Sequence, residues 1–452
     1  MKILSMNDHL DEISSIVGRS NYLADERLLK YFSYDNLREY EIPAVVVFPG
    51  NLKEVKKIIN FAKKCKIPIV PRGAGTGRTG GASGIKGGIV VSTIRLNKII
   101  DIDEKNRLVI TESGVLNGDL QDKLKEFNLF YPPDPASMYI STIGGNIAEN
   151  AGGPRAVKYG LTSNYLIGIK AVTGNGEIIK KERLLLKDVS SYNLPQFFVS
   201  SEGTLGIITE SIHRLLNLPD KIFMAVISIK KEKLFENIFY NIIKNNINPM
   251  SVEFIDEKIS NLLAEKYGFI KRDSYAVLLI EIEGDERDVN SRIQTLKNMV
   301  KDCEVYISDQ EENVEEIRQM RRNISSFISV LYTNKSSFDI SVPLDKISKM
   351  LLVLKKIEKR YNIDIKSFGH AGDGNLHVNV LYNEKPLLFA DIEDGIIRGA
   401  IRLGGSITGE HGIGIKNLKY LKYMYSNSDI KILRGIKHYF DPSNIMNPGK
   451  KI

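Results

Sequence analysis

Hydrophobic and polar residues alternate along the first part of the chain in a pattern of short strands and amphipathic helices. Residues 44–48 form an unbroken apolar run, Ala-Val-Val-Val-Phe, which predicts a buried strand. Apolar residues then recur at helical spacing between 52 and 62, and residues 67–70 predict a second strand. The pattern therefore predicts a β-α-β unit that leads directly into the segment at residues 71–88.

This pattern continues to about residue 217 and then changes. Residues 108–111 predict a further strand, and the leucines at 116, 120 and 124 lie on one face of the helix expected after it. Beyond Asn217 glycines become sparse, and apolar strands alternate with lysine-rich helices. The strands expected there are 223–229, 251–255, 276–282 and 304–307. This texture is typical of a separate α+β domain with an antiparallel sheet.

The segment at residues 71–88 holds eight of the 36 glycines of the chain. Glycine tolerates a positive φ and has no Cβ, so successive backbone N–H groups can converge on one anion, such as a cofactor pyrophosphate. A flexible surface loop is the alternative interpretation. Gly75, Gly77 and Gly80 also fit the pattern G-x-G-x-x-G, but that dinucleotide fingerprint needs a helix after its last glycine. Residues 89–93 predict a strand instead, which excludes a Rossmann fold.

Two further clusters of small and polar residues follow, at 132–160 and 200–209. The first contains paired glycines beside Thr142 and Asn146, which can place backbone donors and side-chain amides around a flat polar heterocycle. The second is a turn that leads into an apolar strand. Taken singly, each cluster is equally consistent with a glycine-rich tight turn.

Three of the six histidines of the chain lie in two segments near its C-terminal end, 368–380 and 406–414. His377 and Asn379 are two residues apart on an expected strand, so their side chains point to the same face. His370 precedes a glycine turn and can fold back toward them.

Two imidazoles and the carboxylate of Glu410 would make a three-ligand set with an open position, the pattern of a catalytic divalent metal. His411 would then be free to act as a base near neutral pH. The alternative is a histidine that only hydrogen-bonds in the core, and we expect this role for His9, His213 and His438.

Composition excludes several classes of protein. The 452 residues are 42% hydrophobic and 26% charged, as in an ordinary globular protein, and allow two or three domains. No apolar run approaches the ~18–20 residues of a membrane span, and the start lacks the apolar core of a signal peptide, so we expect a cytoplasmic protein. Two cysteines exclude an iron–sulfur cluster built by this chain alone. The net charge of +8 is scattered over helix faces, which disfavours nucleic-acid binding.

The three glycine-rich clusters, in this order, resemble the FAD-binding domain of the vanillyl-alcohol-oxidase/p-cresol-methylhydroxylase (PCMH) superfamily. With the C-terminal motifs G-H-x-G-D-G-N-L-H and G-E-H-G-x-G and the N-P-G-K ending, nearly the whole chain resembles one of its families. That family contains D-lactate dehydrogenase, the glycolate oxidase catalytic subunit and D-2-hydroxyglutarate dehydrogenase.

The resemblance implies an α+β fold class. A PCMH-type FAD-binding domain of two α+β subdomains would be joined by a substrate (cap) domain with an antiparallel sheet and flanking helices. The implied bounds are 1–38 for an N-terminal helical segment, 39–218 for the FAD-binding domain, 219–425 for the cap domain with its metal site, and 426–452 for a C-terminal segment that returns to the flavin.

The resemblance also implies roles for the residues that match its motifs. The pyrophosphate would be cradled by residues 71–82, namely Pro71, Arg72, Gly73, Ala74, Gly75, Thr76, Gly77, Gly80, Gly81 and Ala82. The flavin would be lined by Pro133, Asp134, Ser137, Gly144, Asn146, Asn150, Gly153 and Gly160. Glu202, Gly206 and Ile207 would lie near the adenosine part, and Asn447 would approach from the terminal segment.

In the second half of the chain, the family's metal ligands match His370, His377 and Glu410. Asn379 matches a substrate-side amide, and His411 the catalytic histidine. The arginine that holds the substrate carboxylate falls within residues 319–323; we choose Arg321, although the spacing fits Arg322 nearly as well.

The implied reaction is FAD-dependent oxidation of a D-2-hydroxy acid to the 2-oxo acid, with D-lactate and glycolate as the leading candidate substrates. A divalent metal, zinc or else manganese or iron, would polarise the 2-hydroxyl, His411 would take its proton, and the hydride would pass to flavin N5. Some relatives attach FAD covalently through a histidine in the first glycine loop. Residues 71–88 contain none, so we expect FAD to be held noncovalently.

Longer relatives also carry a cysteine-rich iron–sulfur module, which this sequence lacks. We therefore expect a separate electron acceptor: an electron-transfer flavoprotein, an iron–sulfur subunit or a quinone, the last compatible with peripheral membrane association. An oxidase that uses O₂, and a catalytic subunit that depends on a partner protein, are the alternative interpretations.

Overall fold

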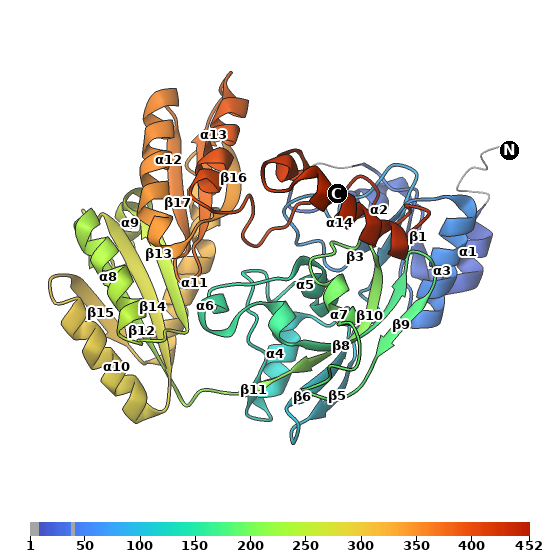
Figure 1. Ribbon diagram of the computed structural model, residues 1–452, viewed down its shortest axis with the longest axis horizontal. Coiled ribbons are helices and arrows are strands. Elements are labelled where there is room, and N and C mark those ends of the chain that lie inside the picture. Colours follow the sequence, from blue (N-terminus) through green and yellow to red (C-terminus); the bar gives the residue numbers. More distant parts are fainter. Residues whose placement is uncertain (1–8, 38–40) are drawn as a thin grey trace. The chain divides into compact units, whose positions relative to one another are not determined.

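The computed structural model describes residues 9–37 and 41–452 (Figure 1). Its contacts divide the chain into two compact units. The first unit combines the chain up to residue 152 with 161–218 and 410–452, and the second contains 153–160 and 219–409. Part of the expected N-terminal helical segment, residues 1–8 and 38, lies outside the described residues.

Two short segments group with a different unit from the one that their place in the sequence suggested. Residues 153–160 belong to the second unit, because the Lys158 ammonium pairs there with a buried glutamate carboxylate. Residues 410–425 belong to the first unit, because the Gly414 N–H donates to the buried carboxylate of Glu202 at 2.6 Å. Each segment thus makes a polar contact within the unit to which it belongs, a contact that a change in composition does not reveal.

The first unit contains a four-stranded sheet in the order β1-β2-β4-β3, in which β2, β4 and β3 run parallel. Helix α3 (Leu52–Cys65) links β2 to β3 and packs with α1 (Leu10–Val17) against one face of the sheet. The strands are β1 (Tyr22–Leu23), β2 (Val45–Val47), β3 (Ile69–Arg72) and β4 (Ile89–Ser92). The β-α-β unit and the strand after the glycine run are thus confirmed.

A five-stranded antiparallel sheet, in the order β5-β6-β10-β8-β9, forms the rest of this unit. Its strands are β5 (Ile99–Asp103), β6 (Leu108–Glu112), β8 (Leu166–Thr173), β9 (Ile178–Lys181) and β10 (Gly206–Arg214). Smaller elements around it are α2 (Glu26–Leu29), α4 (Asn117–Lys125), β7 (Leu129–Phe130), α5 (Ile143–Glu149), α7 (Leu194–Phe198), β11 (Leu216–Asn217) and α14 (Asn427–Phe440). The strand and helix expected between 108 and 124 are β6 and α4.

The second unit is built on a seven-stranded sheet in the order β15-β12-β14-β13-β17-β18-β16, and every neighbouring pair is antiparallel. The strands are β12 (Lys221–Ile229), β13 (Ser251–Asp256), β14 (Ala276–Gly284), β15 (Glu304–Ser308), β16 (Asn334–Ser341), β17 (Asp364–His370) and β18 (Asn375–Tyr382). The antiparallel sheet and the four strands expected between 223 and 307 are confirmed.

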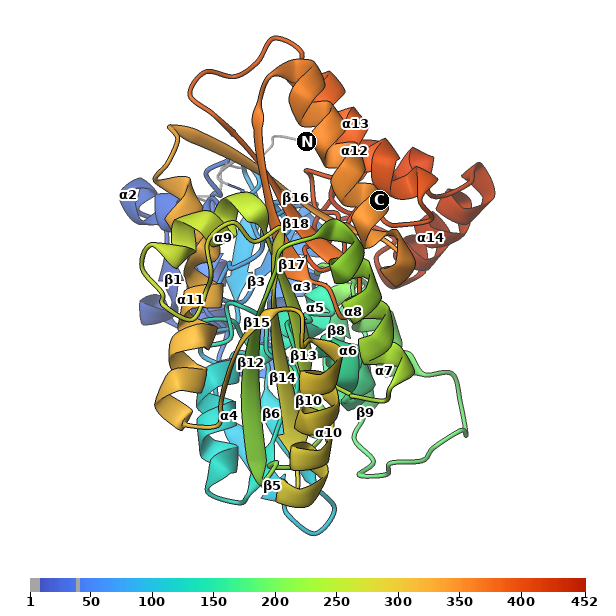
Figure 2. The ribbon, with the colours of Figure 1, turned by 90° about the vertical axis from the view of Figure 1, so that its left-hand side faces the viewer.

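Helices cover both faces of this sheet. Figure 2 shows α11 on one side and α8 and α10 on the other. Leu279 of β14 and Ile317 of α11 belong to the apolar core beneath α11. The helices are α6 (Ala156–Tyr159), α8 (Glu232–Lys244), α9 (Glu257–Ala264), α10 (Glu286–Met299), α11 (Glu311–Ser329), α12 (Ile347–Tyr361) and α13 (Phe389–Arg402). Among the described residues, no helix combines the length and the apolar character that crossing a membrane would require.

Candidate active site

The glycine run of the first unit is a loop between β3 and β4 that folds around a buried arginine. Arg72 ends β3 and is 8% exposed, and its Nη1 donates to the carbonyl oxygens of Tyr34 and Ala82 at 2.9 Å each. Gly75 has a φ of +73°, and a Cβ built on it would lie 2.1 Å from Arg72 Nη2. The position thus needs glycine twice over, for its backbone conformation and for the space that the guanidinium occupies.

The C-terminal segment closes this loop within the same unit. Asn447 Nδ2 donates to the Gly81 carbonyl at 3.0 Å and to the Glu202 carbonyl at 2.7 Å. Lys450 Nζ donates to the Gly81 carbonyl at 3.1 Å, and burial lowers the pKa of this ammonium to about 8. The Asn447 N–H also continues the edge of the sheet by donating to the Ile69 carbonyl at 2.8 Å. Asn447 therefore lies beside the first and third glycine clusters.

The second cluster contains a helix, α5, after a stretch of coil and turn at residues 132–141. Thr142 caps α5, since its Oγ1 accepts the Gly145 N–H at 3.2 Å, and the same oxygen would lie 2.2 Å from a Cβ on Gly73. Gly144 packs against Ser113, where a Cβ would meet the Ser113 Cβ at 2.6 Å. The first and second clusters are thus in direct contact.

Several predicted flavin-lining residues carry polar groups that suit a ligand. The side chain of Asn146 is buried on α5, and its Nδ2 has no hydrogen-bond partner among the described residues. Asn150 ends the helix with a φ of +54°, and its Oδ1 accepts the Ser163 N–H at 2.9 Å. A buried amide without a partner suits a ligand heteroatom, so Asn146 fits the edge of a polar ring.

The other predicted flavin-lining residues divide between the two units. Pro133, Asp134, Ser137 and Gly144 belong to the first unit, whereas Gly153 and Gly160 flank α6 in the second. The Pro133 carbonyl accepts the Asn117 Nδ2 at 3.1 Å.

The third cluster contributes a buried carboxylate to the same unit. Glu202 accepts the N–H groups of Ile413 and Gly414 at 2.8 and 2.6 Å, and Gly206 opens β10, with Ile207 buried behind it.

A second carboxylate faces Glu202. A Cβ built on Gly412 would lie 2.7 Å from Glu149 Oε2 and 2.8 Å from Glu202 Oε1. Burial raises the pKa of Glu149 well above its ordinary value, and the negative charges of Glu202 and Asp35 raise it further, although the Lys451 ammonium opposes this.

In the second unit, strand register places four chemically active side chains on one sheet face. Glu253 of β13 lies directly opposite His370 of β17. His377 of β18 lies between Phe368 of β17 and Asp339 of β16. Because side chains alternate along a strand, Glu253, His370, His377 and Asp339 all point to the face that α11 covers.

Glu253 joins a histidine to an arginine. Its Oε1 lies 2.5 Å from His370 Nδ1, and its Oε2 forms an ion pair with Arg321 Nε of α11. The Arg321 guanidinium also lies over the Phe368 ring, 4.7 Å from its centroid. Burial alone would raise the pKa of Glu253, but the charges of Arg321 and His370 hold it below its ordinary value.

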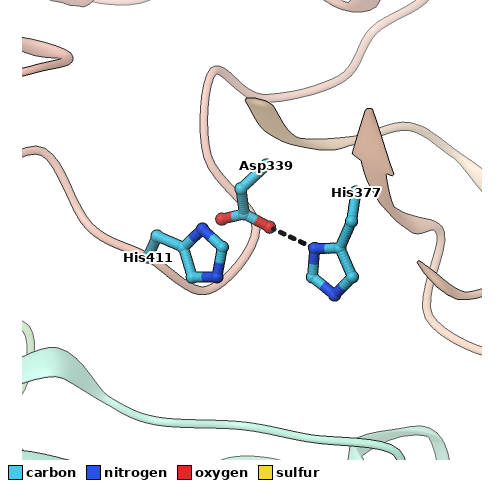
Figure 3. A group of neighbouring side chains, drawn as sticks. All are labelled: Asp339, His377 and His411. Carbon is cyan, nitrogen blue, oxygen red and sulfur yellow. Dashed lines mark ion pairs between the residues drawn. The ribbon is translucent and has the colours of Figure 1, made fainter. Parts of the chain in front are cut away.

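Asp339 serves the second histidine in a similar way. Its Oδ1 forms an ion pair with His377 Nδ1 at 3.5 Å, which Figure 3 shows as a dashed line. Its Oδ2 accepts the Thr408 hydroxyl at 2.9 Å and the Gly409 N–H at 3.0 Å. Asp339 therefore fixes both the His377 ring and the backbone that immediately precedes Glu410 and His411.

The two imidazoles are near enough to share an ion. The ring centroids of His370 and His377 are 5.2 Å apart, with the ring planes at 87°. Each Nδ1 faces a carboxylate, the arrangement in which proteins orient metal-binding histidines, and one ring nitrogen of each histidine lies within 4.8 Å of the other. Glu410, the expected third ligand, is one peptide bond beyond Gly409.

Arg321 and Arg322, between which the sequence spacing could not choose, have different surroundings in the structure. Arg321 is 9% exposed, and its Nη2 is buried without a hydrogen-bond partner among the described residues. Arg322 instead pairs with Glu315 on the more exposed side of α11. Asn379 is buried, and its Oδ1 accepts the Ser337 hydroxyl at 2.8 Å.

Sequence reasoning missed Glu253, Asp339 and Glu149. A signal existed for the first two, because each is a charged residue inside an apolar strand, Val-Glu-Phe and Phe-Asp-Ile. Burying a carboxylate without a partner is costly, so such residues indicate a cation or donor opposite them. For Glu149 at the end of α5, local sequence contains no comparable signal.

Comparison with known proteins shows the family to which the chain belongs. Residues 43–181 match the family model described as "FAD binding domain", and residues 231–451 match "FAD linked oxidases, C-terminal domain". Glycolate oxidase subunit GlcD of Bacillus subtilis is 36% identical over 98% of this chain and 96% of that protein. D-lactate dehydrogenase of Anaerostipes hadrus is 32% identical over 96% and 95%, and D-2-hydroxyglutarate dehydrogenase of Stutzerimonas stutzeri is 32% identical over 98% of both.

Solved structures show the same fold. p-Cresol methylhydroxylase with substrate bound superposes with a TM-score of 0.81 at 16% identity, over 99% of this chain and 96% of the other. 4-Ethylphenol oxidase from Gulosibacter chungangensis gives 0.78 at 17% identity, over 99% and 97%. The fold is therefore the PCMH-type α+β fold expected from the glycine clusters.

The protein is therefore a flavoenzyme with a PCMH-type FAD-binding domain. The chain belongs to the family of FAD-linked oxidoreductases that includes glycolate oxidase subunit GlcD, D-lactate dehydrogenase and D-2-hydroxyglutarate dehydrogenase.

Proposed function

We propose that this enzyme oxidises a D-2-hydroxy acid to the 2-oxo acid and passes the electrons to a separate acceptor. D-lactate and glycolate are the leading candidate substrates. The observation that carries the proposal is Arg321, a buried guanidinium whose Nη2 has no hydrogen-bond partner among the described residues, beside two histidines. An arginine suits a carboxylate, and a pair of imidazoles suits a metal next to a hydroxyl. A 2-hydroxy acid offers these two groups on adjacent carbons.

The first unit fits noncovalent FAD. Its glycine loop closes around Arg72, the buried amide of Asn146 awaits a partner, and no histidine occurs in residues 71–88. When bound, FAD supplies the acceptor for the hydride of the substrate C2.

The second unit fits one divalent metal. We propose His370 and His377 as ligands, each through Nε2, with Glu410 as the third and zinc, manganese or iron as the ion. The support is the pair of carboxylates behind the two Nδ1 atoms, together with the anchored Gly409 that precedes Glu410. When bound, the metal supplies a Lewis acid that lowers the pKa of the substrate hydroxyl.

The remaining steps belong to side chains of this chain. Arg321 binds the substrate carboxylate through its outer nitrogens, because its Nε is held by Glu253. His411 accepts the hydroxyl proton as the general base. Asn379, a buried residue of β18, orients the substrate through its side-chain amide. Arg321 thus fixes the position of C2, and His411 removes the proton that must leave as C2 becomes a carbonyl carbon.

Anaerobic stopped-flow reduction of the flavin by D- and L-2-hydroxy acids tests this function without any assumption about the acceptor. We expect reduction by D-lactate or glycolate in the wild type. In His411→Ala we expect reduction to slow by ~10²–10⁴-fold, the usual contribution of a positioned base, with FAD and metal retained. His438→Ala is the control: contrary to the core position expected from the sequence, this imidazole is exposed, on the solvent-facing side of α14.

Three outcomes contradict parts of the proposal. Failure of every 2-hydroxy acid to bleach the wild-type flavin overturns the substrate class. Loss of metal in His411→Ala makes His411 a ligand, and an unchanged rate removes it as the base. Steady-state assays with O₂, a quinone analogue and an electron-transfer flavoprotein then identify the acceptor.

A further inference from the structure

We infer that Glu253 is a positioning residue that orients a metal ligand and the substrate arginine with the two oxygens of one carboxylate. The inference rests on the proposed function, because it takes His370 as a ligand and Arg321 as the carboxylate-binding group. No motif of the sequence marks Glu253.

The contacts of Glu253 are divided between the two partners. Oε1 lies 2.5 Å from His370 Nδ1, so this contact sets the orientation of the ring and directs Nε2 toward the proposed ion. Oε2 pairs with Arg321 Nε, which leaves the outer guanidinium nitrogens for a planar, two-point contact with a carboxylate. Each oxygen thus fixes which atom of its partner can face the reaction.

Burial makes this arrangement rigid. Glu253 is 3% exposed, and its neighbours on β13, Val252 and Phe254, are buried apolar residues. Strand pairing places Glu253 directly opposite His370, so backbone register sets their separation. Such a carboxylate is held by its cationic partners, and removing it leaves a buried guanidinium uncompensated.

The same sheet face provides a matched comparison. Glu281 of β14 is also buried, at 6% exposure, and it also pairs with an arginine of α11, Arg318, with Nε at 3.2 Å. Opposite charges hold its pKa below the ordinary value, as they do for Glu253. Glu253 differs from Glu281 in its contact with an imidazole of the histidine pair, His370 Nδ1, which lies 2.5 Å from its Oε1. Replacing either glutamate by glutamine therefore removes the same charge from the same layer.

The test measures divalent-metal affinity on flavin-loaded protein. Mn²⁺ or Zn²⁺ is titrated in chelator buffers, and the bound metal is counted by elemental analysis. For Glu253→Gln we expect metal affinity to fall ~10–100-fold, the usual effect of removing the carboxylate behind a ligand histidine. For Glu281→Gln we expect metal affinity to change by less than ~3-fold, because its carboxylate pairs with Arg318 and acts independently of the histidine pair. Flavin content should be that of the wild type in both, since the glycine loop lies in the other unit.

Kinetics separate the second contact of Glu253 from the first. At saturating metal, KM for the 2-hydroxy acid should still be raised in Glu253→Gln, because the glutamine amide faces the Arg321 Nε–H with a donor of its own. Glu281→Gln should keep the wild-type KM. A Glu253→Gln defect that excess metal abolishes completely would contradict the arginine half of the inference.

A second variant covers the case in which Glu253→Gln fails to fold. Glu253→Asp keeps the charge but is one methylene shorter, so its carboxylate cannot reach both partners. Wild-type metal affinity in both Glu253 variants would overturn the inference. If the wild type and His377→Ala bind the metal equally, the metal site of the proposed function is wrong, a result distinguishable from failure of Glu253 alone.

Discussion

Two buried glutamates, Glu149 in the first unit and Glu253 in the second, differ in what faces them. Glu149 lies opposite the carboxylate of Glu202 beside Gly412, and its pKa is raised well above the ordinary value by burial and by that charge. Glu253 is flanked by Arg321 and His370, and its pKa is lowered despite burial. Burial alone therefore does not decide the charge of a carboxylate here; the partner does.

The difference has a functional reading. A carboxylate held ionised by cations can orient an imidazole and a guanidinium, as in the second unit. The raised pKa of Glu149 instead favours its neutral form, beside the glycine loop that contains Gly81. The two units thus place a buried carboxylate in opposite electrostatic surroundings.

The broadest effect that would sharpen this contrast, loss of the cofactor itself, is expected from Gly75→Val. Its Cβ would fall 2.1 Å from Arg72 Nη2, at a φ of +73°, so the loop must open. We expect flavin occupancy, measured as the ratio of absorbance at flavin and protein wavelengths, to drop ~10-fold or more. Gly87→Val is the control, because it shares the positive φ of +74° but has open space within 4 Å. Equal flavin loss in both variants would point to backbone strain alone.

His377→Ala should remove the metal from the second unit and leave flavin binding in the first unit unchanged. Because the variant removes an imidazole ligand held by Asp339, we expect metal content to fall by ~10-fold or more, with flavin retained. Elemental analysis and flavin absorbance on one sample measure both quantities. His438→Ala should change neither. Retention of metal in His377→Ala would leave the histidine pair with a purely structural role.

Arg321→Ala should lower kcat/KM for the 2-hydroxy acid by ~100-fold or more, the range expected when one partner of a buried charged contact is truncated. Arg322→Ala, which removes only the ion pair with Glu315, should change it less than ~3-fold. Michaelis–Menten measurements on both variants settle which arginine binds the carboxylate. A larger effect at Arg322 would reverse the assignment.

The smallest effect is expected for Glu149→Gln. The raised pKa means that the folded state binds more protons than the unfolded state above the ordinary pKa of a glutamate, so wild-type stability falls as pH rises. Glutamine removes that dependence. We expect the variant to gain ~1–4 °C in Tm over the wild type at pH 8, and less at pH 5, at saturating FAD. A gain that is equal at both pH values would exclude protonation of Glu149 as its cause.

Much of the fold could be predicted because its signals are local. The apolar run at 44–48, the helical spacing of 52–62 and the glycine loop each depend on neighbouring residues, and the structure confirms all three as elements of one sheet region. Gly144 and Gly145 were harder to interpret. They lie in a helix because Thr142 caps it and because close contact with Ser113 leaves no room for a Cβ.

The chemistry of the second unit was only half visible in the sequence. His370 and His377 stand in a recognisable motif, but Glu253 is 117 residues away from His370 in the chain. Their contact follows from strand order, which places β13 beside β17, and the order of strands in a sheet is not encoded in any local pattern. A charged residue in an apolar strand was the available clue, and it indicates that a partner exists without naming it.

The hydrogen bond from Asn447 to Gly81 determines when the glycine loop at residues 71–88 can be completed during synthesis. The two residues are 366 positions apart, so a ribosome that adds 5–20 residues per second takes roughly 20–70 s to travel between them. During that interval Gly81 has been made, but the amide that contacts both it and Glu202 has not. The link between the first and third glycine clusters therefore forms only after Asn447 has been added to the chain.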